Sequence, residues 1–64
     1  MADHIVIDEF HLTLEVPRGL PDSESEAIRR TLDSARFQAR LRRAAQRVCR
    51  RQRSLAKVRV QLSR

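Results

Sequence analysis

Aromatic residues and cysteine are scarce in this 64-residue chain, and each scarcity excludes a class of protein. There is no Trp or Tyr, and Phe10 and Phe37 are better used in a core, so the stacking platforms of single-strand nucleic-acid binders are missing. A lone cysteine, Cys49, permits neither an internal disulfide nor a cysteine zinc site. We expect Cys49 to be a small buried or half-buried side chain.

Glycine and catalytic groups are scarce as well. The only glycine and both prolines fall within residues 17–21, which predicts one turn and leaves no glycine-rich phosphate loop. The sequence contains no recognisable catalytic set of nucleophile, base and orienting residue, so we expect no enzyme and no cofactor. His4, Asp8, Glu9 and His11 are the residues that most resemble a metal-binding set. A metal ion requires three or four ligands that converge on one point. We do not expect these residues to converge, and we therefore expect no metal.

No apolar run approaches the roughly 18 residues that a membrane span requires. The first residues, Met-Ala-Asp-His, lack the basic and apolar regions of a signal peptide. We therefore expect a cytoplasmic, soluble protein without a membrane partner. At 64 residues the chain forms one small domain, residues 1–64, near the lower size limit for independent folding. This size favours a homodimer over a marginal monomer.

Two segments alternate apolar and polar residues with a period of two, as a half-buried strand does. In residues 9–16, the apolar side chains are Phe10, Leu12, Leu14 and Val16. In residues 57–62, they are Val58, Val60 and Leu62. We predict a strand for each segment.

Between these segments the apolar residues recur with helical spacing. The apolar stripe of residues 28–39 lies roughly opposite that of residues 37–48, and one straight helix cannot bury both. We therefore predict a helix over about residues 23–32 and a longer one over 35–52, with a break near Asp33-Ser34. Ser23 and Glu26 have the spacing of a capping box for the first helix.

The predicted fold class is α+β, a β-α-α-β domain whose two strands are covered on one face by a short and a longer helix. Two helices that run along the sheet in opposite directions favour antiparallel strands. An unbroken helix would favour a parallel, right-handed β-α-β crossover instead. Because two strands make a weak sheet, we expect a dimer that shares one sheet.

Charge divides the chain into two halves. Residues 1–26 carry a net charge of −6 and residues 27–64 a net charge of +12, which together give the overall +6. No acid follows Asp33, so the arginines of the second predicted helix have no acidic neighbours on that helix. Six of them recur on one side: Arg36, Arg40, Arg43, Arg47, Arg50 and Arg51.

Like charges at helical spacing repel, and a solvated structural helix usually mixes both signs. The sequence therefore predicts a non-catalytic polyanion-binding surface, with nucleic acid as the first candidate partner and phosphate contacts rather than base readout. Two alternatives remain open. The face could dock an acidic protein, or the chain could be a structural homodimer whose acids, such as Glu9 and Glu15, neutralise the arginines.

Overall fold

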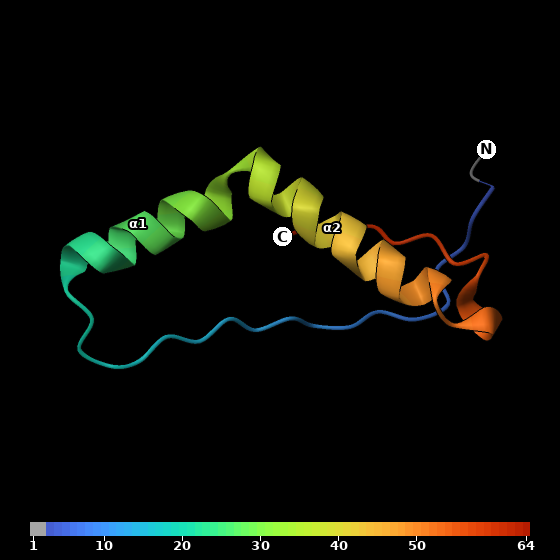
Figure 1. Cartoon of the computed structure of the whole chain (residues 1–64), viewed down its shortest axis with the longest axis horizontal. Coiled ribbons are helices and arrows are strands. Elements are labelled where there is room, and N and C mark those ends of the chain that lie inside the picture. The colour runs from blue at the N-terminus through green and yellow to red at the C-terminus, as the bar shows by residue number, and fades with distance from the viewer. Residues whose placement is uncertain (1–2) are drawn as a thin grey trace.

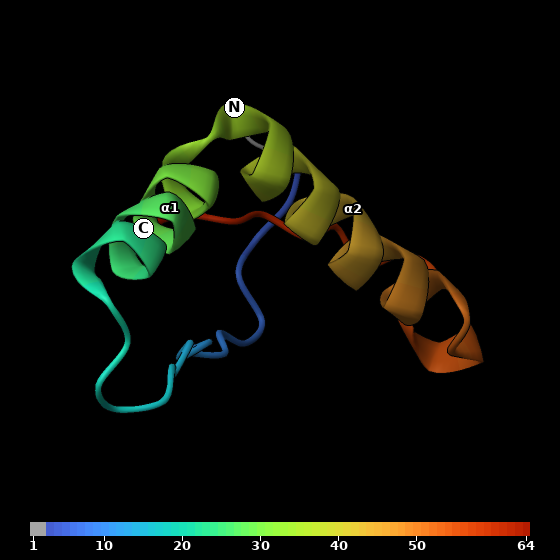
Figure 2. The same ribbon diagram turned by 60° about the vertical axis from the view of Figure 1, so that its left-hand side comes forward.

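The computed structural model describes residues 3–64 and consists of two helices above extended chain (Figure 1). Helix α1 spans Asp22–Asp33, helix α2 spans Ala35–Arg50, and a 3₁₀ turn, η1, spans Arg53–Leu55. Residues 4–16 and 58–64 have no regular secondary structure. The helices form a widely open helical hairpin. The N-terminal extended segment lies on its inner side, and the C-terminal segment passes along α2 and ends at the helix junction (Figures 1 and 2).

The predicted α+β fold is wrong, because residues 3–64 contain no β-strand. Residues 9–16 and 57–62 were expected to pair as two strands, but no backbone hydrogen bond joins them. A strand ladder needs neighbouring backbones about 4.8 Å apart, so that each supplies the other's hydrogen bonds. Here α2 holds residues 58–60 instead. The sheet expected to be shared by a dimer is therefore absent as well.

The antiparallel arrangement is also wrong. In Figure 1, residues 4–16 run from right to left beneath the helices, and residues 57–64 also run from right to left, passing behind α2. The reason is the wide opening of the hairpin. Helix α1 begins at one end of the molecule and α2 finishes at the other, so the chain returns in its original direction (Figure 1).

The predicted break between the helices is confirmed at Ser34. This residue has extended backbone angles, φ −73° and ψ 137°, which cannot continue a helix. Its amide donates to the carbonyl of Thr31 at 3.1 Å, and its hydroxyl accepts from the amide of Phe37 at 3.0 Å. Ser34 therefore ends α1 and caps α2, and both helices fall within two residues of their predicted bounds.

The predicted capping box of Ser23 and Glu26 is not formed. Helix α1 begins earlier, with Pro21 at the N-cap position and no side-chain hydrogen bond there. The Pro21 carbonyl instead accepts from the amides of Glu24 and Ser25, at 3.0 and 3.1 Å. With Pro21 in this role, Ser23 lies inside the first helical turn and cannot cap it.

The predicted turn of residues 17–21 is present. Arg18 and Gly19 form it, and Gly19 has a φ of 81°, in the left-handed region that L side chains rarely adopt. This turn reverses the chain between the extended N-terminal segment and α1 (Figure 1).

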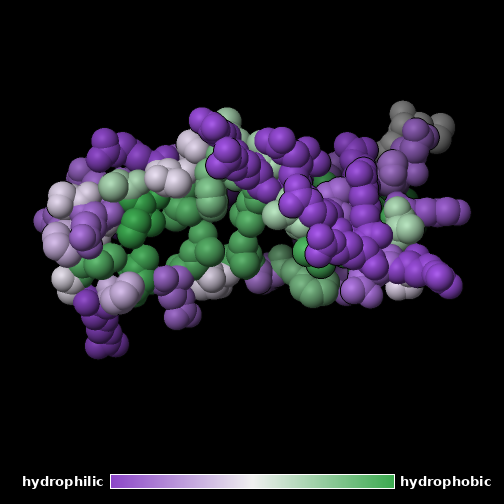
Figure 3. Space-filling model, viewed as in Figure 1, coloured by the Kyte–Doolittle hydropathy of each residue, from purple (hydrophilic) through white to green (hydrophobic). Residues whose placement is uncertain are grey.

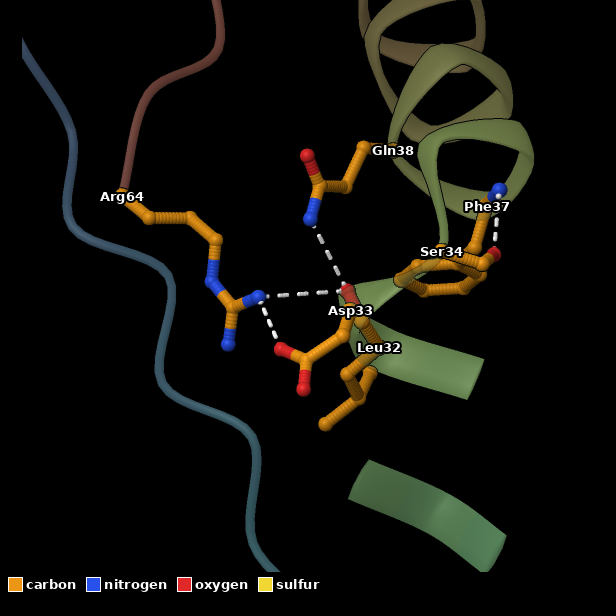
Figure 4. A network of polar contacts seen from close by, with 6 residues as sticks. All are labelled: Leu32, Asp33, Ser34, Phe37, Gln38 and Arg64. Atoms are coloured by element: carbon orange, nitrogen blue, oxygen red, sulfur yellow. Dashed lines mark hydrogen bonds and ion pairs between the residues drawn. The ribbon is translucent and has the colours of Figure 1, made fainter. Parts of the chain in front are cut away.

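The C-terminal segment is fixed to the helices at two points. The side chain of Gln46 donates to the Val58 carbonyl at 2.7 Å and accepts from the Val60 amide at 2.9 Å. At the helix junction, Arg64 forms an ion pair with Asp33 and a hydrogen bond with the Leu32 carbonyl (Figure 4). These contacts replace the strand pairing that the sequence predicts.

No residue in the part of the chain that the structure describes is buried. Phe10, expected in a core, is 90% exposed, whereas Phe37 is half-buried. The apolar side chains nevertheless gather around one open hollow of about 490 Å³ between the helices and the extended segments. We call this hollow the apolar trough; its main lining residues are Phe10, Leu12, Leu14, Leu32, Phe37 and Leu41.

Replacing the capping serine tests the helix junction. Ser34→Ala removes the hydroxyl that accepts from the Phe37 amide, so we expect the free energy of unfolding to fall by about 1 kcal/mol. Ser34→Gly is the matched control, because glycine at an N-cap costs only a few tenths of a kcal/mol. Urea unfolding followed by circular dichroism measures both. Equal losses in the two variants would contradict the capping role.

Gln46→Leu tests how the C-terminal segment is held. Leucine keeps the size of the side chain but removes both hydrogen bonds to residues 58–60. We expect faster hydrogen exchange at the Val60 amide, while amides in the middle of α1 keep their rates. An unchanged rate at Val60 would show that Gln46 does not hold this segment.

Candidate anion-binding surface

The six arginines predicted to bind anions lie on one side of α2 and at its end. Arg36 through Arg50 belong to the helix, and Arg51 is its C-cap residue with helical backbone angles. At 3.6 residues per turn, the six Cα positions fall within a sector about 100° wide. We call this sector the arginine face; it consists of Arg36, Arg40, Arg43, Arg47, Arg50 and Arg51.

Every residue of the arginine face is exposed to solvent. Figure 3 shows hydrophilic side chains gathered over α2, on the outer side of the molecule. Only Arg43 has an intramolecular side-chain hydrogen bond, a long one of 3.4 Å to the Ala39 carbonyl. The guanidinium groups of the other five are therefore directed to solvent.

The acids of the chain do not neutralise this face. Among residues 3–64, Asp33 with Arg64 is the one ion pair, and it involves no member of the arginine face. Glu9 and Glu15, which were considered as acids that could neutralise the arginines, form no ion pair among these residues. Since the expected strands do not pair, nothing brings these opposite charges together.

A shallow hollow of about 310 Å³ lies within the arginine face. It is lined by Arg40, Arg43, Ala44 and Arg47. Ala44 leaves the space, because its methyl group does not fill the gap between the long arginine side chains. Three cations around such a hollow can hydrogen-bond a phosphate or a carboxylate through planar guanidinium groups.

The inward face of α2 differs from the predicted apolar stripe of Phe37, Leu41, Ala44 and Val48. Phe37 and Leu41 are half-buried, but Ala44 is exposed and Val48 is 62% exposed. The half-buried positions continue instead through four residues further around the helix: Gln38, Ala39, Gln46 and Cys49.

Sequence reasoning missed the two glutamines because it read polar residues as solvent-facing. Their amide groups bind backbone instead. Gln38 donates to the Leu32 carbonyl at 3.0 Å (Figure 4). Gln46 binds residues 58–60. Cys49 is half-buried, as expected.

The structure shows no second site of the kinds considered from the sequence. No three His, Cys, Asp or Glu side chains within residues 3–64 gather as a metal ion requires, and His4, Asp8, Glu9 and His11 form no such group. Across the same residues, no helix combines the length and apolarity needed to cross a membrane. The arginine face is therefore the candidate site with the most support.

Salt should stabilise α2, because the arginine face contains about five like-charged pairs at i,i+3 or i,i+4 spacing, each costing about 0.2–0.5 kcal/mol. Screening should recover about 1–2 kcal/mol between low and high sodium chloride. The measurement is urea unfolding at each salt concentration. Arg47→Gln, which removes the residue in most of these pairs, should reduce the salt dependence, whereas Arg29→Gln on α1 should not. A stability that falls with salt would mean that the acids do neutralise this face.

Comparison of the chain with protein-family models, with curated proteins and with solved structures finds no match in any of the three. The functional assignment therefore depends on the residues of this chain alone.

Proposed function

We propose that the arginine face binds a polyanion, with nucleic acid as the first candidate, and that the protein is not an enzyme. The observation that carries this proposal is six exposed arginines in one sector of α2 without an ion-pair partner in residues 3–64. Such an arrangement repels itself in the free protein, and an external polyanion removes the repulsion.

The length of the face suits a nucleic-acid backbone. From Arg36 to Arg51 the helix rises about 22 Å, at 1.5 Å per residue. An equal length of duplex carries about 13 phosphates, at one charge per 1.7 Å of axis. A duplex that lies along the arginine face therefore offers more phosphates over that length than there are arginines. The bidentate geometry of guanidinium and phosphate adds hydrogen bonds to the charge attraction.

Sequence readout is not part of the proposal. The arginine face contains no aromatic side chain for base stacking and no Asn or Gln for base edges, and Gln38 and Gln46 already bind backbone. Phosphate contacts fix position without reading sequence. We therefore expect similar affinity for duplexes of different sequence. We also propose a cytoplasmic location, which the lone half-buried Cys49 fits.

The test is fluorescence anisotropy of labelled random-sequence duplex DNA and RNA across salt concentrations. With six phosphate contacts on duplex DNA, the slope of log Kobs against log salt should be about −5, and affinity should fall about a thousandfold from 50 to 200 mM salt. The double variant Arg40→Glu/Arg47→Glu should weaken binding at least about tenfold. It should also make the slope less steep, by about 2.

The matched control is Arg29→Glu/Arg42→Glu, which changes the net charge equally. Arg29 lies on α1, and Arg42 lies about 120° from Arg36 around α2, outside the arginine face. Both are exposed. Equal losses in the two double variants would show attraction to overall charge rather than a site. Absence of binding at 50 mM salt would overturn the proposal and favour an acidic protein as partner, since carboxylates pair with the same guanidinium groups.

A further inference from the structure

The apolar trough is lined by large apolar side chains of the kind that a folded core buries, yet it is open. Phe10, Leu12 and Leu14 are 90%, 63% and 56% exposed. Figure 3 shows apolar side chains of this part of the molecule lining the opening between α1 and the extended segment. Exposed apolar side chains that gather on one surface are characteristic of an interaction site.

The chain as a whole exposes more surface than a compact protein of its mass. The chain exposes 6783 Å². A compact protein of its mass, 7.5 kDa, exposes about 4,200 Å², so the excess is about 2,500 Å². The radius of gyration, 15.3 Å, likewise exceeds the roughly 11 Å of a compact chain of this length. A small ligand in the trough would remove little of this chain-wide excess, whereas interfaces of obligate homodimers bury surfaces of this order.

Charge favours a second copy over an acidic or basic partner. Arg64 is the one charged residue that lines the trough, and it is already paired with Asp33. The trough therefore suits a partner with an apolar surface. The exposed residues Phe10, Leu12 and Leu14 of another copy provide such a surface. The acidic half of each copy, at −6, can then lie against the basic half of the other, at +12, which offsets the repulsion between two chains of +6.

We propose that a second copy of this chain covers the apolar trough, with Phe10, Leu12 and Leu14 of each copy packed into the trough of the other. A two-fold axis makes such an interface self-complementary, because the same surface serves both partners. The interface lies on the inner side of the helical hairpin, whereas the arginine face lies on the outer side. The proposal is therefore independent of polyanion binding.

Sedimentation equilibrium of the full chain under reducing conditions tests the proposal. We expect a species of twice the 7.5 kDa chain mass at micromolar concentrations. Phe10→Glu places a charge in the interface and should raise the dimer dissociation constant at least about 100-fold. Because Phe10 is 90% exposed in one copy, this substitution removes little packing within that copy, which circular dichroism checks.

Ile7→Glu is the matched control. Ile7 is 89% exposed on the same extended segment, but it does not line the trough. This variant should keep its dissociation constant within about threefold of the unmodified chain. Nuclear Overhauser effects between a labelled copy and an unlabelled copy should connect Leu12 with Phe37 or Leu41.

Three results would overturn the proposal. The first is a monomer at concentrations up to about 200 µM, well above the micromolar concentrations at which the dimer is expected. The second is an equal loss of dimer in Phe10→Glu and Ile7→Glu, which would indicate unspecific apolar association. The third is a dimer without Overhauser contacts between trough residues of different copies.

Discussion

The bend at Ser34 is the constraint on which the rest of this structure depends. An uninterrupted helix would bond the Leu32 carbonyl to the amide four residues later. Because Ser34 is extended, that carbonyl instead accepts from Gln38 and from Arg64 (Figure 4). One residue thus ends α1, caps α2 and frees the acceptor that fixes the end of the chain. The two arms of the hairpin and the C-terminal segment meet at this point.

The bend also separates the two surfaces to which we assign interactions. The inner side of the hairpin carries the apolar trough, and the outer side of α2 carries the arginine face. Gln46 contributes to this separation, because its contacts with residues 58–60 turn a polar position of α2 inward. Charge repulsion on one side and apolar exposure on the other are both costs in the single chain, and we propose a partner of different chemistry for each.

Local patterns predicted the local structure well. Polar capping chemistry located the break at Ser34, the proline and glycine cluster located the turn at Gly19, and helical spacing located both helices and the arginine face. All six arginines are exposed, as their place on one side of the helix predicts. No acid lies near them on the helix. These features depend on residues within a few positions of one another.

The prediction was wrong where the outcome depends on distant residues. Alternation in residues 9–16 and 57–62 predicts extended chain with two faces, but a sheet also requires that the two backbones meet. Here the side chain of Gln46 forms hydrogen bonds with the backbone of Val58 and Val60. The alternation of apolar and polar residues does not predict these contacts. The capping box failed for a similar reason, since the Pro21 carbonyl started the helix before Ser23 could cap it.

The extended N-terminal segment has a consequence for the lifetime and the charge of the chain. An exposed extended backbone is the form that peptide-binding grooves, those of proteases included, accept as an added strand. Residues 1–16 contain four acids and no base, so a cut after Val16 would raise the net charge from +6 to +10. Any partner that covers this segment would therefore preserve the net charge of the chain as well as its length.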